Sequence, residues 1–173
     1  QGILFAGQIL ARAAMAQDLE VLWIPSYGPE MRGGTASCTV IVAGEPIGSP
    51  VVDRADAVVV LNPPSMAMFE PTVTPGGLLV VNTSLIEALP SRSDIEVVAV
   101  PCTALARTAG DDRLVSVVAL GALLARRQFV SLSAARDAIA AVVQAKRPEI
   151  LTADLAALDA GYAAALEGVA TLA

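Results

Sequence analysis

Histidine is absent from this chain of 173 residues, and cysteine occurs only at Cys38 and Cys102. Without histidine or a cysteine cluster, the chain alone cannot form an imidazole-based catalytic triad, a histidine-ligated metal site or a cysteine-ligated iron–sulfur cluster. Two isolated cysteines also give no disulfide framework, which with the lack of a signal peptide favours a reducing cytoplasm. We therefore expect no metal site and no complete catalytic site within this chain.

Charge and long apolar runs are scarce as well. Charged residues make up 16% of the chain, and the net charge of −6 leaves no basic surface for nucleic acid or an anionic membrane. The longest apolar stretch, residues 117–125, is far shorter than the about 20 residues of a membrane-spanning helix. Hydrophobic residues account for 55% and mean hydropathy is +0.65, which excludes disorder and predicts an apolar surface covered by partners.

The order of apolar segments predicts one α/β domain over residues 1–173. Short apolar strands are expected at 20–24, 37–42, 57–61, 78–81 and 97–100. Helices are expected at 3–14, 63–69, 104–108, 114–125 and 134–144, with a last one from Thr152 to Val169. Ser131 or Ser133 can cap the fifth of these helices, and Thr152 can cap the last. We expect a three-layer domain with a largely parallel, Rossmann-like sheet and a helical C-terminal tail.

The segment from Pro25 to Ser37 is the most unusual in composition. Three glycines and two prolines stiffen it, and it presents Tyr27, Glu30 and Arg32. It follows an expected strand of a parallel sheet, and such sheets bind ligands at the carboxyl ends of their strands. The segment is therefore a candidate binding loop, and the alternative is an ordinary connector with a local Glu30–Arg32 ion pair worth at most about 1 kcal/mol.

A weaker candidate lies at the front of the chain. Gln1 and Gly2 stand at the start of the first expected helix, where backbone N–H groups favour an anion. Neither a G-x-G-x-x-G pattern nor a P-loop is present, since Gly2 and Gly7 are expected inside the helix and no Lys-Ser/Thr follows Gly33-Gly34. An independent nucleotide site is unsupported.

Several sequence blocks resemble the gamma subunit of the 2-oxoacid:ferredoxin oxidoreductases. The blocks are Gln1-Gly2-Ile3 with Ala6-Gly7, Ser26-Tyr27-Gly28-Pro29-Glu30-Met31-Arg32-Gly33-Gly34, Glu45-Pro46-Ile47-Gly48-Ser49-Pro50, Ala55-Asp56-Ala57, Leu120-Gly121-Ala122 and Lys146 to Tyr162. In that family the first helix follows a G-x-G-G-Q-G turn, so the first strand and the first glycines of the turn are expected to be missing here. Arg113 and Asp154 depart from the pattern, because the family commonly has asparagine at both positions.

The resemblance implies a subunit of a complex that converts a 2-oxoacid and CoA to an acyl-CoA and CO2 while reducing ferredoxin. It implies that thiamine diphosphate with Mg2+ lies between the alpha and beta subunits and that [4Fe-4S] clusters lie in the beta and delta chains. This chain would bind no cofactor by itself. The sequence around Tyr27 favours 2-oxoglutarate as the expected substrate, with pyruvate or a branched-chain acid as alternatives.

The resemblance assigns a place to the loop. Tyr27, Gly28, Pro29, Glu30, Arg32, Gly33 and Gly34 are expected to pack against the alpha–beta body near the thiamine and CoA channel. Arg32 is then available to pair with a carboxylate or phosphate, or alternatively to bond carbonyl groups of its own loop.

The remaining marked residues favour structural roles. Both cysteines are interpreted as buried thiols, and Trp23 and Phe129 as core or interface anchors. Met66, Met68 and Phe69 predict a half-buried amphipathic turn, and Asn62 and Asn82 are interpreted as turn residues at strand ends.

Two classes of function remain. One is the non-catalytic gamma subunit described above, with alpha, beta and delta chains as partners and ferredoxin reached through the complex. The other is a stand-alone α/β binding module for a small anionic ligand, which predicts a formed pocket and monomeric behaviour.

Overall fold

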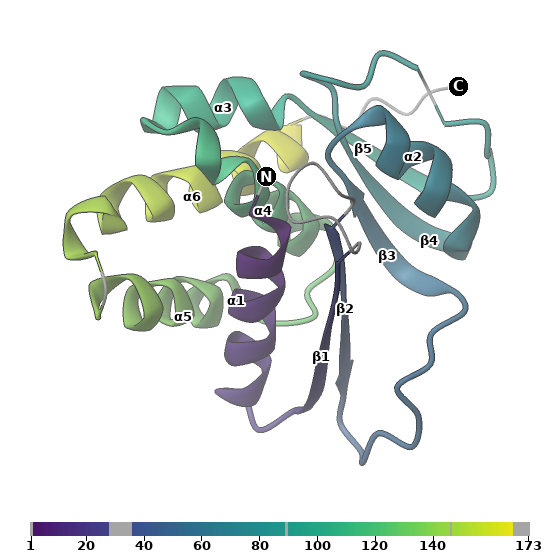
Figure 1. The fold of residues 1–173 in the computed structure, drawn as a ribbon, viewed down its shortest axis with the longest axis horizontal. Coiled ribbons are helices and arrows are strands. Elements are labelled where there is room, and N and C mark those ends of the chain that lie inside the picture. Colours follow the sequence, from purple (N-terminus) through teal and green to yellow (C-terminus); the bar gives the residue numbers. More distant parts are fainter. Residues whose placement is uncertain (1, 28–35, 89, 146, 168–173) are drawn as a thin grey trace.

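The computed structural model describes residues 2–27, 36–88, 90–145 and 147–167. Within them lie the helices α1 (Ile3–Met15), α2 (Pro63–Phe69), α3 (Cys102–Ala109), α4 (Val115–Arg126), α5 (Leu132–Gln144) and α6 (Leu151–Glu167). The strands are β1 (Glu20–Tyr27), β2 (Ala36–Ala43), β3 (Ala55–Val60), β4 (Val73–Asn82) and β5 (Glu96–Val100). Short 3-10 helices precede β4, α4 and α6: η1 (Glu70–Thr72), η2 (Asp112–Leu114) and η3 (Pro148–Ile150). Figure 1 shows their arrangement.

The parallel sheet has the order β3-β4-β5 and separates two apolar cores. Leu78 and Val80 of β4 face the larger core, which contains α4 and α6, whereas Leu79 and Val81 face a smaller core with Met66 of α2. This alternation is the period-2 pattern of a strand covered on both faces. It explains why the central strand is a continuous apolar run.

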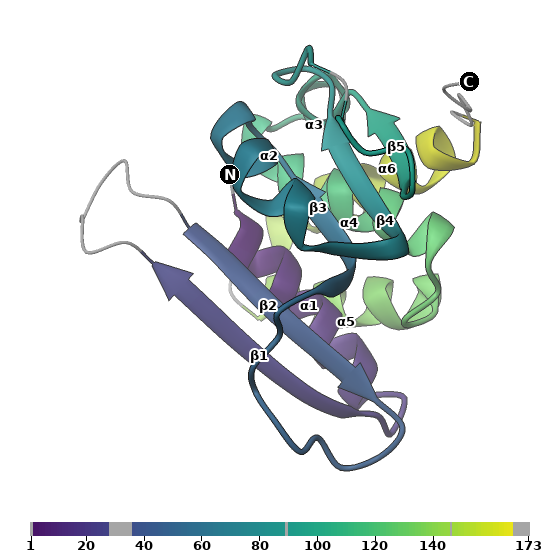
Figure 2. The same ribbon diagram turned by 90° about the vertical axis from the view of Figure 1, so that its right-hand side faces the viewer.

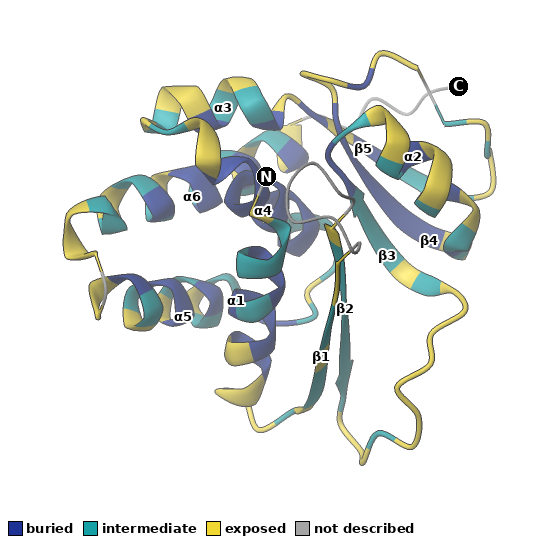
Figure 3. Ribbon diagram, in the orientation of Figure 1, coloured by how far each residue is buried: buried dark blue, intermediate teal, exposed yellow. Residues whose placement is uncertain are grey.

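Helices cover both faces of this sheet, so the molecule has three layers (Figures 1 and 2). The helix α2 packs on one face, and α4 and α6 pack on the other. Every residue of α4 from Val115 to Leu124 is buried, as expected for a helix that is apolar all round (Figure 3). The predicted α/β fold with a parallel sheet and a helical C-terminal tail is confirmed.

One part of the topology differs from expectation. Strands β1 and β2 pair with each other antiparallel, from Glu20 opposite Ala43 to Tyr27 opposite Ala36, and form a separate two-stranded sheet. The prediction that residues 25–37 follow a strand of the parallel sheet is therefore wrong. The physical reason is the length of the connection: β1 extends to Tyr27 and β2 begins at Ala36, so residues 28–35 are too few for a parallel crossover, which needs about a dozen residues or more.

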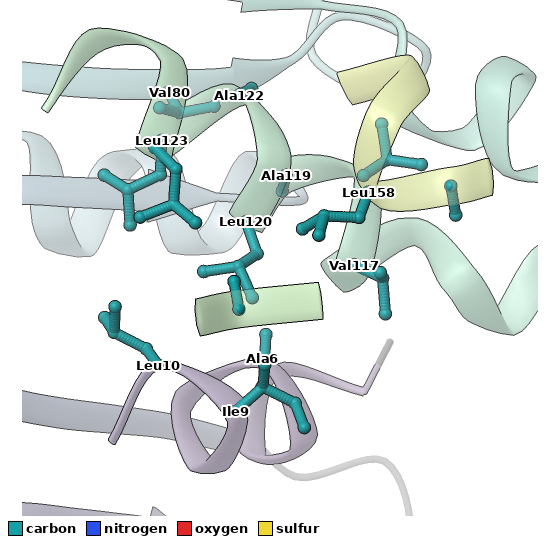
Figure 4. Close-up of a cluster of buried hydrophobic side chains, with 14 of the residues drawn as sticks. Ala6, Ile9, Leu10, Val80, Val117, Ala119, Leu120, Ala122, Leu123 and Leu158 are labelled. Carbon is teal, nitrogen blue, oxygen red and sulfur yellow. The ribbon is translucent and has the colours of Figure 1, made fainter. Parts of the chain in front are cut away.

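The helices α4 and α6 cross with their backbones in contact. An added Cβ at Gly121 would lie 2.0 Å from the carbonyl oxygen of Leu158, and one at Gly161 would lie 1.8 Å from that of Val118. Leu158 is fully buried beside Leu120 and Ala119 of α4 (Figure 4). The two glycines thus allow a helix separation that no larger residue permits.

Helix ends were predicted with mixed success. Ser131 caps α5, because its Oγ accepts a hydrogen bond from the backbone N–H of Ala134 at 3.1 Å. The proposed cap at Thr152 is wrong, since η3 leads into α6 one residue earlier and Thr152 lies inside the helix. Gly2 lies at the N-cap of α1 rather than inside it, with a left-handed φ of 72°.

Candidate functional site

Most of the predicted loop lies outside the described residues. Gly28, Pro29, Glu30, Arg32, Gly33 and Gly34 belong to this group, as does Gln1. Tyr27 is described: it is the last residue of β1, pairs with Ala36 and is 65% exposed. The aromatic ring therefore stands free at the end of the β1–β2 ribbon, where it is accessible to another chain or a ligand.

Gly2 anchors the start of α1 to α4. Its carbonyl oxygen accepts hydrogen bonds from the N–H of Phe5 at 2.9 Å and the hydroxyl of Ser116 at 2.9 Å. A Cβ on Gly2 would lie 2.8 Å from the Ser116 Oγ. No side chain caps this helix, and its first turn contains no acidic residue. The positive end of the helix is thus oriented by α4 and left uncompensated by side chains.

A cavity of about 300 Å³ adjoins this helix start. Its lining residues come from the first half of α1, from η2 and the first turn of α4, and from the end of α5 through the first turn of α6. Its lining comprises Gly2, Phe5, Gln8, Asp111, Arg113, Leu114, Ser116, Val117, Val142, Val143, Arg147, Ile150 and Asp154. We call it the Asp154 cavity.

Asp154, in the first turn of α6, is 2% exposed. Its Oδ2 is buried and has no hydrogen-bond partner. Burial raises the pKa of this carboxyl, the positive charge of Arg147 lowers it, and the negative charge of Asp111 raises it further. A buried acceptor without a partner is rare in folded proteins and calls for an explanation.

Asp111 differs from Asp154 because it is fully paired. Its carboxylate accepts from Arg113 Nε at 2.8 and 3.0 Å and from the Arg113 backbone N–H at 2.8 Å. These hydrogen bonds, with a small opposing contribution from burial, lower the pKa of Asp111 to about 2. Sequence reasoning marked Arg113 and Asp154 only as departures from a family pattern; that both line one cavity became visible only in the fold.

Asn82 joins three elements at the carboxyl end of the parallel sheet. Its amide is fully buried, and its Nδ2 donates to the carbonyl of Leu61 at 3.2 Å and to Thr103 Oγ1 at 3.0 Å. Its Oδ1 accepts from the N–H groups of Ser84 and Thr103, both at 3.3 Å. The turn interpretation of Asn82 is therefore too simple, whereas Asn62 caps α2 by accepting from Ser65 N–H at 2.9 Å. With these hydrogen bonds made, the Asn82 side chain serves the fold.

The two thiols lie in different surroundings. Burial raises the pKa of the Cys102 thiol to about 12 at the start of α3. Cys38 of β2 is half-buried; burial raises its pKa, although a hydrogen bond from Trp23 opposes the shift. Neither has the lowered pKa of a reactive cysteine, which agrees with the interpretation as structural thiols.

A second, wider hollow of about 740 Å³ lies among α1, β1 and α5. Met15 and Trp23 contribute apolar surface to it, and Trp23 is 38% exposed. Phe129 instead packs against the larger core, and Met66 is buried while Met68 is exposed. Trp23 is thus the aromatic residue in the lining of this hollow.

No group of three or more aspartate, glutamate or cysteine side chains in the described part of the chain is arranged to hold a metal ion. None of the described helices is both long and apolar enough to cross a membrane.

Comparison with known proteins agrees with the fold. Residues 1–164 match the family described as "Pyruvate ferredoxin/flavodoxin oxidoreductase". The chain is 40% identical over 125 residues to the ketoisovalerate oxidoreductase subunit VorA of Methanothermobacter thermautotrophicus, a match covering 72% of this chain and 26% of that protein. It is 34% identical over 143 residues to the 2-oxoglutarate synthase subunit KorC of Methanocaldococcus jannaschii, covering 80% and 76% of the two chains.

A solved structure is also similar. The keto/oxoacid ferredoxin oxidoreductase gamma subunit of Geobacter sulfurreducens superposes with a TM-score of 0.80 at 28% identity, covering 96% of this chain and 92% of that one. The chain thus spans nearly all of a separate gamma subunit but only about a quarter of the VorA proteins.

Proposed function

This chain belongs to the pyruvate ferredoxin/flavodoxin oxidoreductase family, and from that premise we propose that it is the gamma component of a multisubunit 2-oxoacid:ferredoxin oxidoreductase. The complex would convert a 2-oxoacid and CoA to an acyl-CoA and CO2 and pass the electrons to ferredoxin. The observation that supports this best is the match to a separate gamma subunit over almost the full length of both chains.

Within that complex the chain would be structural and would flank the site. An iron–sulfur cluster or a metal needs several thiolate, imidazole or carboxylate ligands in one place. The chain has no histidine, and its two cysteines have raised pKa values and lie on separate elements, β2 and α3. These residues do not fit an iron–sulfur cluster, so the [4Fe-4S] clusters are assigned to the beta and delta partners. Thiamine diphosphate with Mg2+ is assigned to the alpha and beta partners, following the family resemblance.

The ribbon end is the proposed contact with those partners. Tyr27 is exposed at the end of β1, and the segment that follows it contains Glu30 and Arg32. Tyrosine and arginine are both enriched among the energetically important residues of protein interfaces. We assign this loop to the alpha–beta body near the CoA channel, with Arg32 available to a phosphate or carboxylate, and the uncapped start of α1 at Gly2 to the same side.

The substrate is proposed as 2-oxoglutarate, on the basis of the amino-acid sequence of residues 26–34 and the similarity to KorC. A branched-chain 2-oxoacid is the second candidate, because the identity to the ketoisovalerate subunit VorA is higher. The complex is proposed to act in the cytoplasm, without nucleic acid or membrane partners.

The test is purification of the tagged chain from its native lysate at low salt. The eluate is assayed for CoA-dependent viologen reduction with 2-oxoglutarate, 2-oxoisovalerate and pyruvate. Co-elution of thiamine-binding and iron–sulfur chains with activity on one acid supports the proposal and identifies the substrate. A chain that elutes alone and inactive favours the alternative, a stand-alone binding module.

The loop assignment has its own variant. Arg32→Ala should raise the KM for CoA or weaken assembly, whereas Arg107→Ala, which removes only an exposed ion pair to Asp112, should change neither. Unchanged assembly, KM and turnover in Arg32→Ala would mean that Arg32 serves its own loop.

A further inference from the structure

The Asp154 cavity contains two opposite charges that are not paired with each other or with another described residue. One is the buried Asp154 carboxyl, whose Oδ2 accepts no hydrogen bond. The other is Arg147, an exposed residue whose guanidinium makes no hydrogen bond or ion pair within the described part of the chain. The charges are close enough for Arg147 to influence the pKa of Asp154.

The other charged pair in the cavity is already satisfied. Asp111 and Arg113 hold each other through several hydrogen bonds, the shortest of 2.5 Å. They therefore contribute little net charge to a ligand. The groups left to recognise one are Asp154, Arg147 and the start of α1 at Gly2.

Asp154 and Arg147 would each bind a different charged group of a ligand. An ionised carboxylate is costly to bury unless a cation or several donors compensate it. Asp154 therefore selects a positively charged donor such as an ammonium group. Arg147 and the positive end of α1 select an anion. A bare metal cation does not fit, because Asp154 is the one unpaired carboxylate among the described lining residues and a metal ion needs several such ligands.

The lining and the volume of the Asp154 cavity restrict the class of ligand further. Six of the lining residues have apolar side chains: Phe5, Leu114, Val117, Val142, Val143 and Ile150. The volume of about 300 Å³ is at the lower limit for small-molecule sites, so the ligand is compact.

We propose that the Asp154 cavity binds an apolar α-amino acid, with its ammonium group on Asp154, its carboxylate towards Arg147 and its side chain against the apolar wall. The inference uses only residues of this chain and does not depend on the proposed function. It predicts an unassigned small-molecule site, apart from the loop after Tyr27.

At a pH low enough for Asp154 to be protonated in the empty cavity, binding should release a proton. The raised pKa of Asp154 in the empty cavity falls when an ammonium group arrives, and Asp111, Arg113 and Arg147 are the charged groups that face it. Proton release makes the apparent binding enthalpy depend on the ionisation enthalpy of the buffer. It also makes the affinity rise with pH.

The test is isothermal titration of the full chain with L-valine, L-leucine and L-phenylalanine in two buffers of different ionisation enthalpy. We expect saturable binding of at least one amino acid with a buffer-dependent enthalpy. Asp154→Asn, which retains the shape, should weaken it by about tenfold or more, and Arg147→Gln by about threefold. Arg107→Ala, outside the cavity, is the matched control and should bind as the parent does.

Three results would overturn the inference. The first is the absence of binding by every amino acid at millimolar concentration, with circular dichroism showing a folded chain. The second is equal binding of 2-oxoisovalerate, which lacks the ammonium group. The third is unchanged amino-acid affinity in Asp154→Asn.

Discussion

Helices α4 and α6 cross backbone to backbone, whereas α1 lies on the β1–β2 ribbon through side chains. At the α4–α6 crossing, the nearest atoms to an added Cβ on Gly161 belong to the backbone of Val118. Under α1, an added Cβ on Gly7 would instead meet Cys38 Sγ at 2.5 Å and Trp23 Nε1 at 3.0 Å. Side chains can rotate away from a new atom, but a helix backbone cannot. A substitution by alanine should therefore be tolerated better at Gly7 than at Gly161.

The largest expected effect is at the crossing. Gly161→Ala should lower the free energy of unfolding by about 3 kcal/mol or more, although alanine is the better helix former, because α6 must move away from α4. Urea denaturation followed by circular dichroism measures it. Gly44→Ala is the control, because a Cβ added at Gly44 would meet no atom within 4 Å apart from its chain neighbours. A loss below 1 kcal/mol would show that the crossing adjusts freely.

In the region of α4 and α6, we expect the buried side chain of Asp154 to lower the stability of the fold. Asp154→Asn should stabilise the chain by about 1 kcal/mol at neutral pH, because it removes an unpartnered buried carboxylate. Burial raises the pKa of the folded-state carboxyl above its ordinary value of 3.8, so the folded state binds the proton more tightly. The parent is then most stable at low pH and loses stability as pH rises through the raised pKa.

The parent chain and Asp154→Asn should therefore have similar free energies of unfolding near pH 3.8, and the two values should diverge as the pH rises above it. Thermal unfolding across this range, without added ligand, measures the divergence. Asp137→Asn, at an exposed position of α5, is the matched control. A constant difference at every pH would show that Asp154 does not titrate abnormally.

A smaller effect is expected under α1. Gly7→Ala should change the free energy of unfolding by less than about 1 kcal/mol, since rotation of Cys38 and the gain in helix propensity offset each other. The same denaturation experiment compares it directly with Gly161→Ala. A loss equal to that at Gly161 would mean that the ribbon side is as rigid as the crossing.

The smallest perturbation uses the thiols as probes of the two regions. At pH 8 a maleimide should modify the half-buried Cys38 slowly and should modify Cys102 only on unfolding, because burial raises the pKa of the Cys102 thiol to about 12. Mass spectrometry of timed samples measures both rates. Faster modification of Cys102 than Cys38 would reverse the order of protection.

Much of the fold was predictable because local patterns determined it. The apolar runs at residues 57–61, 78–81 and 97–100 match β3, β4 and β5 within a few residues, and the Ser131 cap is correct. The direction of β2 was missed because periodicity is the same in parallel and antiparallel strands. The expected strands at 20–24 and 37–42 also left residues 25–36 between them, about enough for a parallel crossover, and only the longer observed strands shorten the connection to residues 28–35.

The candidate site was predicted less well. Tyr27 and Gly2 were marked from composition and position, and the structure places the first at the exposed end of β1 and the second at the anchored start of α1. Nothing local marks Asp154 as buried. Acidic residues are common in the first turn of a helix, where they are normally exposed.

By itself, the sequence determined the class of fold, the exclusion of histidine and iron–sulfur chemistry, and the family resemblance, because each depends on residue type and local order. Only the tertiary structure decided that β1 and β2 form a separate ribbon and that Gly121 and Gly161 bring α4 and α6 into contact. The structure alone also brought Asp111, Arg147 and Asp154 to one cavity. Such contacts join residues far apart along the chain, and their energies depend on three-dimensional separation rather than on sequence spacing.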